Sequence, residues 1–304
     1  MSLTLHDRVL GAIIGSALGD ALGMPVEGLS HINVRTYYKG IKGMRADEKR
    51  ADLDAGQGTA DTQRARALTR AFTTAAPDSP EEARAAFAAE LDAAGPLRRG
   101  EVAASPSAAP AAAAVALGAV ARLRGLREIA LARWAALLFT PVDRHPAAHV
   151  AAAAQAAAIR AALEADPDSP DGAEILSRAL VTARDAERTL STDDRVSARL
   201  ASLVDRLDEF PLDLQDACGG TGSAADEAFP FAVAMAARGA ALAEATVLSA
   251  VNVGGDTAAV GAMTGALVGA LHGAEAFPSD WLDALEDAGA IRAEAEALVE
   301  AVGR

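Results

Sequence analysis

The stretch VLGAIIGSALGDALGMPVEG, residues 9–28, carries a glycine at every fourth position from 11 to 23. Residues four apart lie on the same face of an α-helix, so these glycines form a stripe without side chains along one face. Each glycine destabilises a helix by about 1 kcal/mol relative to alanine. That loss is explained if a second helix backbone packs closely against the stripe.

A second stretch, NVGGDTAAVGAMTGALVGALHG at residues 252–273, repeats the pattern with glycines at 261, 265, 269 and 273. The two stretches lie near opposite ends of the chain, and their stripes are suited to pack against each other. No low-complexity linker divides the sequence between them. We therefore expect residues 1–304 to form a single domain in which the two ends of the chain meet.

The composition predicts an all-α protein. Hydrophobic residues make up 51% of the chain and aromatic residues only 4%, and alanine is the commonest residue by a wide margin. Alanine is the best helix former and is depleted in strands. No stretch shows the β-branched alternation typical of strands. Further helices are expected after Thr59, after Pro80 and over residues 190–207, among other places.

Charge and cysteine content limit the classes of partner. The formal net charge of −14 disfavours nucleic acid, because such a surface needs clustered Lys and Arg to displace counterions. A lone cysteine, Cys218, cannot form an intrachain disulfide, which fits a reducing compartment. Residues 258–271 are too few for a membrane span of about 20 residues, and residues 9–15 lack a signal-peptide pattern. We predict a cytoplasmic protein with neither membrane nor nucleic-acid partner.

Polar residues gather where the glycine stripes end. Asp20 and Glu27 follow the first stripe, and Asn252 and Asp256 precede the second. Between them, TADTQ at residues 59–63 offers a threonine as helix N-cap and an acid in the first helical turn. A helix dipole favours an acid there, so capping alone could explain it. Carboxylate and hydroxyl oxygens at helix N-termini are, however, also suited to Mg²⁺, and free N–H groups there bind phosphate.

In this order, these motifs resemble the ADP-ribosylglycohydrolase family, including its dinitrogenase-reductase-activating type. Residues 11–28 are similar to the family's glycine-striped "GDA.G.P.E" helix, and TADTQ matches its T-D-D-T motif in part. Residues 252–273 match its N-x-G-G-D-T-D-T segment in part, and AFPSDWLDAL at 276–285 is similar to its tail. The resemblance covers roughly residues 8–70 and 218–285.

The resemblance implies an orthogonally packed, all-α globule with a two-magnesium site between its first and last helices. There the family hydrolyses the bond from the terminal ribose of ADP-ribose to a protein side chain or a small acceptor. By position, Thr59, Asp61 and Asp256 correspond to metal ligands, and Glu27 to the acid near the reacting ribose. Glu27 and Asp61 are the candidate catalytic residues. The candidate ligand-binding residues are Asp20, Gly220, Gly222, Asn252, Gly254 and Gly255.

Three alanines depart from the family pattern. Ala60 replaces the middle acid of the first ligand triplet, and Ala258 and Ala259 replace two ligands of the second. Two metal ions about 3.5–4 Å apart need shared carboxylates to offset their repulsion. We therefore expect one magnesium ion at most, or none.

Two functions remain open at this point. One is hydrolysis of an ADP-ribosyl or related N- or O-glycosidic bond at a one-metal or metal-free site, with Glu27 or Asp61 as base. The alternative is a non-catalytic relative that binds ADP-ribose or a nucleotide as a sensor or partner module. Both imply an ADP-ribose-like small molecule or an ADP-ribosylated substrate. A purely structural remnant is disfavoured by the retained acids.

Overall fold

The computed structural model describes residues 3–100, 105–193 and 195–303, and within these ranges every regular element is a helix. The all-α prediction is confirmed. The helices are α1 (Leu5–Gly23), η1 (Met24–Val26), α2 (His31–Asn33), η2 (Val34–Tyr38), α3 (Ala60–Thr74), α4 (Pro80–Ala93), α5 (Ala109–Ala113), α6 (Val115–Leu123), α7 (Glu128–Leu138), α8 (Pro146–Glu164), α9 (Gly172–Leu190), α10 (Arg195–Ala201), α11 (Pro211–Ala217), α12 (Ala225–Arg238), α13 (Ala243–Val251), α14 (Thr257–His272), η3 (Ala274–Ala276), α15 (Ser279–Ala284) and α16 (Ala288–Val302).

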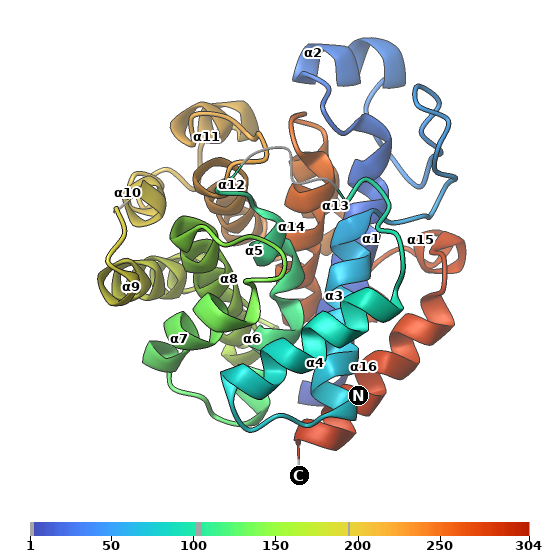
Figure 1. Cartoon of the computed structure of the whole chain (residues 1–304). Helices are drawn as coiled ribbons and strands as arrows, with labels where there is room; N and C mark the ends of the chain where they lie inside the picture. The colour runs from blue at the N-terminus through green and yellow to red at the C-terminus, as the bar shows by residue number, and fades with distance from the viewer. Residues whose placement is uncertain (1–2, 101–104, 194, 304) are drawn as a thin grey trace.

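The two glycine-striped helices, α1 and α14, form the centre of the molecule and run antiparallel (Figure 1). A Cβ atom added at Gly19 would lie 1.9 Å from the carbonyl oxygen of Gly261. One added at Gly265 would lie 2.0 Å from the carbonyl oxygen of Gly15. The backbones are therefore in direct contact along the stripes, and the predicted meeting of the two ends of the chain is confirmed.

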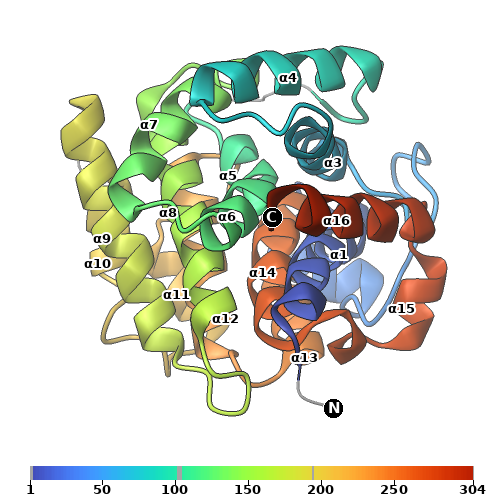
Figure 2. The same ribbon diagram turned by 90° about the horizontal axis from the view of Figure 1, so that it is seen from below.

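The other helices surround this pair (Figure 2). Helices α8 and α12 pack against α14, with α9 outside them, and α3 and α16 pack on the side of α1. Most of the buried positions of α8 are alanines, whose small side chains allow neighbouring helices to approach closely. One continuous core of buried residues extends from Val9 in α1 to Val302 in α16.

Residues Leu5–Val26 are long and apolar enough to cross a membrane by length and composition alone. In the folded chain the whole apolar window of this segment is buried. Its neighbours are α14, α16 and α3, so here it serves as a core helix.

The predicted helix over residues 190–207 is longer than the helix that forms there. Helix α9 ends at Leu190, because Ser191 adopts a left-handed backbone conformation with φ of 52°. Only Arg195–Ala201 forms a helix after it, and the chain continues in turns. Leu200 at the end of α10 and Leu203 in the following turns are both buried in the core, so the apolar spacing that suggested a longer helix is satisfied by a shorter one.

Candidate functional site

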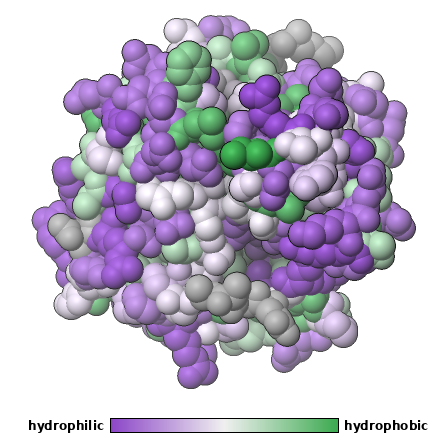
Figure 3. All heavy atoms as spheres, turned by 90° about the horizontal axis from the view of Figure 1, so that it is seen from above, coloured by the Kyte–Doolittle hydropathy of each residue, from purple (hydrophilic) through white to green (hydrophobic). Residues whose placement is uncertain are grey.

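A pocket of about 850 Å³ opens where the glycine stripes end, at the C-terminus of α1 and the N-termini of α3 and α14. Figure 3 shows this end of the molecule, where mostly hydrophilic side chains surround a hollow. The pocket is lined by Glu27, Gly28, Arg50, Thr59, Ala60, Asp61, Arg64, Leu97, Arg99, Gly100, Ser107, Ala109, Gly222, Ser223, Gly255, Asp256 and Ala259.

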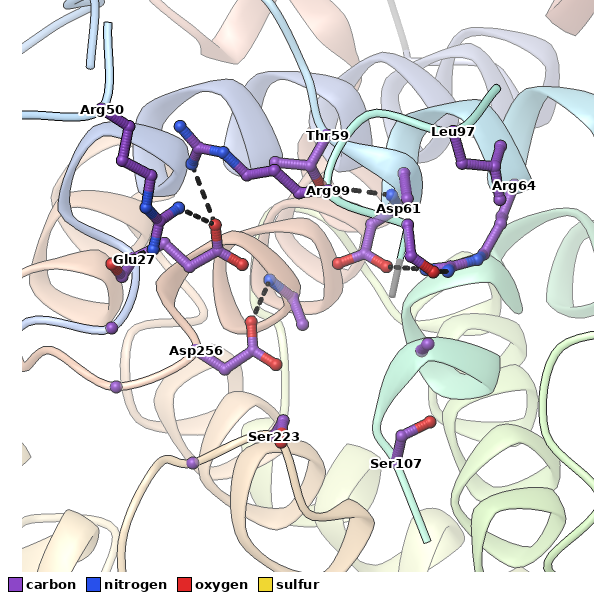
Figure 4. Close-up of a pocket in the computed structure, with 17 residues that line it drawn as sticks. Glu27, Arg50, Thr59, Asp61, Arg64, Leu97, Arg99, Ser107, Ser223 and Asp256 are labelled. Atoms are coloured by element: carbon purple, nitrogen blue, oxygen red, sulfur yellow. Dashed lines mark hydrogen bonds and ion pairs between the residues drawn. The ribbon is translucent and has the colours of Figure 1, made fainter. Parts of the chain in front are cut away.

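Three carboxylates reach this pocket from three separate segments (Figure 4). Glu27 follows η1, Asp61 lies in the first turn of α3, and Asp256 is the N-cap of α14. The sequence analysis selected all three, and the structure brings them together around one hollow.

A glycine turn holds the two ends of the chain together at the pocket. Gly254 and Gly255 both have left-handed φ angles, of 87° and 85°. The N–H of Gly255 donates to the carbonyl oxygen of Leu29 at 2.8 Å. The N–H of Gly28 donates to the carbonyl oxygen of Gly255, also at 2.8 Å. A Cβ atom at Gly254 would lie 2.3 Å from the Leu29 oxygen, so only glycine fits. This turn sets Asp256 beside the segment that carries Glu27.

Asp20 lies beneath the pocket and does not line it. Its side chain is fully buried, and Oδ2 accepts hydrogen bonds from the backbone N–H groups of Thr59 (2.8 Å) and Thr62 (2.9 Å). The Thr62 hydroxyl donates to the same oxygen at 2.6 Å, whereas Oδ1 has no partner among the described residues. Burial raises the pKa of Asp20. Asp20 thus anchors the N-terminus of α3, which presents Asp61.

Asp61 is buried and faces an arginine of its own helix. Thr59 caps α3 as predicted, with its hydroxyl accepting from the Asp61 N–H at 3.2 Å. Arg64 Nη1 donates to Asp61 Oδ1 at 3.2 Å, and Nη2 donates to the carbonyl oxygen of Gly100. Burial raises the pKa of Asp61 well above its usual range; the Arg64 charge opposes this rise, and repulsion from Asp20 and other nearby acids adds to it.

Glu27 is paired with two arginines. Its Oε2 accepts from Arg50 Nη1 at 3.0 Å and from Arg99 Nη1 at 2.9 Å. Arg99 also pairs with Asp47 and Asp52, so every nitrogen of its guanidinium is engaged. These acids raise the pKa of Arg99, although burial opposes the rise. Arg99 is therefore a permanent cation on the wall of the pocket.

Asp256 differs from the other two acids because, within the described ranges, no arginine lies within ion-pair distance of it. Its Oδ1 accepts the N–H of Ala259 at 3.3 Å, which caps α14. Burial, followed by repulsion from Glu27, raises the pKa of Asp256 to about 6. A carboxyl group that titrates near 6 can gain and lose a proton under physiological conditions.

Some of the remaining predicted ligand-binding residues line the pocket, and the others lie outside its lining. Gly222 and Gly255 line the pocket, whereas Gly220 and Gly254 lie behind its lining. The N–H of Gly222 donates to Glu227 Oε2 at 3.0 Å. Asn252 is also outside the lining: its amide accepts from the Ile41 N–H at 2.7 Å and donates to the Ile41 carbonyl oxygen at 2.9 Å. Asn252 therefore holds the loop after η2 against the end of α13.

The alanines of the ligand motifs leave few oxygens for a metal ion. Ala60 and Ala259 line the pocket as methyl groups, and Ala258 is fully buried beside α1. The donors that remain are two carboxylates and one hydroxyl, and one carboxylate already faces Arg64. In the described part of the chain, no three His, Cys, Asp or Glu side chains are placed to share an ion. This donor set does not fit two adjacent divalent ions, and binding of a single ion stays a prediction.

Sequence reasoning missed the three arginines and two serines of the lining. Arg64 follows Asp61 at helical spacing, so that pair could have been anticipated. Arg50 and Arg99 lie 23 and 72 residues from the Glu27 that they bind, and no local pattern indicated them. Ser107 and Ser223 sit at the opposite rim in Figure 4.

The fold and the site together define an all-helical protein with an acid-lined pocket where the C-terminus of α1 meets the N-termini of α3 and α14. A family model described as ADP-ribosylglycohydrolase matches residues 1–304, so the chain belongs to the ADP-ribosylglycohydrolase family. The structure is similar to a solved "ADP-ribosylglycohydrolase-related protein complex", with a TM-score of 0.68, 23% identity and 99% of each chain covered, which supports the fold. An uncharacterized protein of Archaeoglobus fulgidus is 42% identical over 59 residues, a match that spans 19% of each protein.

Proposed function

We propose that the pocket binds an ADP-ribosyl group and hydrolyses the N- or O-glycosidic bond from its terminal ribose to an acceptor, without needing a divalent ion. The observation that carries this proposal is the pairing of pocket acids with arginines: Asp61 with Arg64, and Glu27 with Arg50 and Arg99. Guanidinium groups thereby supply positive charge in a site where the family resemblance implies metal ions. The lining contains three acids and three arginines, so one positive charge is in excess when Asp61 carries a proton.

The three acids suit three different roles. Glycoside hydrolysis passes through a transition state with positive charge on the sugar, and it needs one group to accept a proton and another to donate one. Asp256, with a pKa of about 6, is mostly ionised at neutral pH and accepts the proton of the attacking water. Asp61, whose pKa burial raises well above its usual range, is assigned the role of proton donor. The negative charge of Glu27 stabilises the cationic sugar.

The bond changes balance without any further reactant. The water oxygen bonds to the anomeric carbon of the ribose, and its proton passes to Asp256. The bond from that carbon to the acceptor nitrogen or oxygen breaks, and its electron pair stays on the acceptor, which takes the proton of Asp61. The products are free ADP-ribose and the released acceptor. The base is therefore assigned to Asp256 instead of Glu27 or Asp61, because both of those face arginines.

The proposal is tested by incubating the protein in EDTA with ADP-ribose linked to arginine (N-linked) and to serine (O-linked). We expect chromatography to detect free ADP-ribose from at least one substrate. Asp256→Asn should slow release by about 100-fold or more, and kcat/KM should fall below about pH 6 as Asp256 becomes protonated. Glu82→Gln, an exposed acid of α4, is the matched control and should keep the full rate. Release only after magnesium is added, or an unaffected Asp256→Asn variant, contradicts the proposal.

A non-catalytic ADP-ribose-binding module is the second candidate, and the alanines at three ligand positions favour it. The two candidates share the pocket but differ in the reaction. Calorimetric binding of ADP-ribose together with no release from either substrate would select the binding module.

A further inference from the structure

Residues 31–50 differ in charge from the rest of the chain. All three lysines of the protein (Lys39, Lys42 and Lys49) and both of its tyrosines (Tyr37 and Tyr38) lie in this segment. It holds six of the 28 Lys and Arg and two of the 42 Asp and Glu, a net charge of +4, which leaves the other 284 residues at −18. The segment comprises α2, η2 and the following loop, at the pocket end of the molecule (Figure 1).

Four cations of this segment are exposed and lack an acidic partner. Arg35, Lys39, Lys42 and Lys49 are all exposed, and no carboxylate of the described chain lies within 4 Å of them; Lys39 Nζ contacts only a backbone carbonyl oxygen. Elsewhere, arginines such as Arg66 are held in ion pairs. Unpaired cations on an acidic molecule form a local field that attracts an anionic partner.

A groove of about 500 Å³ runs through the same segment. It is lined by Leu29, Asn33, Tyr37, Tyr38, Glu48 and Lys49. Two large side chains stand out into solvent here, Tyr37 with 73% and Ile32 with 72% of their surface exposed. Glu48 is paired with Arg45, so the only acid of the groove is already neutralised. Tyrosine is enriched at protein-binding hot spots, and Lys49 adds one cation to the lining of this groove.

The groove adjoins the pocket through two shared segments. Leu29 of the groove follows Gly28 of the pocket, and its carbonyl oxygen accepts the hydrogen bond from Gly255. Lys49 of the groove precedes Arg50 of the pocket. A polypeptide lying in the groove would therefore pass close to the mouth of the pocket.

We propose that this groove binds an acidic, extended segment of the polypeptide that carries the ADP-ribosyl group. The inference rests on the proposed function, since it supplies the acceptor side of the same substrate. A short acidic peptide interacts with the four cations within the screening distance of about 8 Å at physiological salt. A long nucleic acid or an anionic bilayer would extend over the remaining surface, whose net charge of −18 would repel it.

The binding test uses fluorescence anisotropy with a dye-labelled ten-residue peptide of alternating glutamate and glycine. The test variant combines Lys39→Glu, Lys42→Glu and Lys49→Glu. The control combines Arg127→Glu, Arg144→Glu and Arg184→Glu, three exposed arginines on the α7–α9 side that give the same change in net charge. We expect Kd to rise at least tenfold for the test variant and less than threefold for the control. Tyr37→Ser should weaken binding severalfold without changing the charge.

Equal effects of the two triple variants would overturn the inference, because binding would then follow net charge alone. Tighter binding of a single-stranded oligonucleotide, or of vesicles containing anionic lipid, would also overturn it.

A second measurement separates this inference from the proposed function. The lysine variant should release ADP-ribose from a small arginine-linked substrate at the wild-type rate. If the wild-type protein releases no ADP-ribose but binds the peptide in the predicted pattern, the proposed function is wrong and the assignment of the groove as a peptide-binding site is supported. If ADP-ribose is released at the expected rate but the peptide does not bind, only the assignment of the groove as a peptide-binding site is wrong.

Discussion

The contact between α1 and α14 and the pocket at its end are built from the same two stretches of sequence, yet they depend on different properties. In the contact, backbone meets backbone, and a Cβ atom at Gly19 would lie 1.9 Å from a carbonyl oxygen. In the pocket, Ala60 and Ala259 contribute methyl groups to the lining, and Glu27 and Asp61 are paired with Arg50, Arg64 and Arg99. The comparison indicates that the two stretches determine the helix contact and one side of the site, while arginines before, within and after α3 determine its charge.

The largest effect is expected from filling the helix contact. Gly19→Ala would place a methyl group against the backbone of Gly261, which cannot move without separating the two helices. We expect a loss of about 3 kcal/mol or more in the free energy of unfolding, measured in urea. Gly289→Ala is the control: no atom lies within 4 Å of its added Cβ, so alanine should be neutral or stabilise α16 by up to about 1 kcal/mol. Equal stability of the two variants would contradict the close contact.

The second largest effect is expected from removing Arg99, the arginine on the pocket wall that pairs with Glu27 and Asp47. Arg99→Ala would leave Asp47, whose side chain is only 3% exposed, without its closest cation, and would take one arginine from Glu27. Breaking a buried pair in this way destabilises by about 3 kcal/mol. In the control, Arg133→Ala, both the arginine and its partner Glu81 are mostly exposed, and the loss should stay below about 0.5 kcal/mol. A loss below 1 kcal/mol for Arg99→Ala would show that the ion pair of Arg99 with Asp47 does not stabilise the fold around the pocket.

Asp256→Asn should stabilise the protein, with an effect that depends on pH. The pKa of Asp256 is raised from 3.8 to about 6, so the folded state favours the protonated form. The ionised acid therefore lowers stability progressively as pH rises from about 4 to 6, and fully above that. We expect the variant to gain about 1–3 kcal/mol at pH 8 and almost nothing at pH 4. Urea unfolding at both pH values measures this; an equal gain at both would contradict the assignment.

Restoring one lost acid should give the smallest change. Ala60→Asp adds a carboxylate to the lining beside Asp61 and Thr59. In 5 mM magnesium we expect its free energy of unfolding to rise by about 1 kcal/mol through weak ion binding. Wild type and Ala60→Asn, which matches the size without the charge, should respond by less than about 0.3 kcal/mol. A larger response of the wild type would mean that the present acids suffice for a metal.

Local sequence patterns were sufficient for much of the scaffold. The glycine spacing predicted the contact of the two glycine-striped helices, α1 and α14, and the TADTQ motif located the cap of α3 at Thr59. The meeting of Glu27 and Asp256 follows from that contact, whereas Asp61 was added to the site by the family resemblance. These features depend on residues within a few helical turns of one another, or on a repeated spacing that is visible in sequence.

The charge of the site and the directions of its polar side chains could not be predicted from local sequence patterns. Arg99 reaches Glu27 across 72 residues of chain. Asp20 turns beneath the pocket to anchor α3, and Asn252 turns toward Ile41. The direction of a polar side chain depends on which distant backbone groups need a partner, and the motif does not contain that information.

We propose that arginines take the place of divalent cations in a pocket that binds ADP-ribose. Isothermal titration calorimetry of the wild-type protein with ADP-ribose, performed once in EDTA and once in excess magnesium, tests it most directly. We expect binding in both buffers, with Kd values that agree within about twofold. Binding in magnesium alone, or in neither buffer, would contradict it.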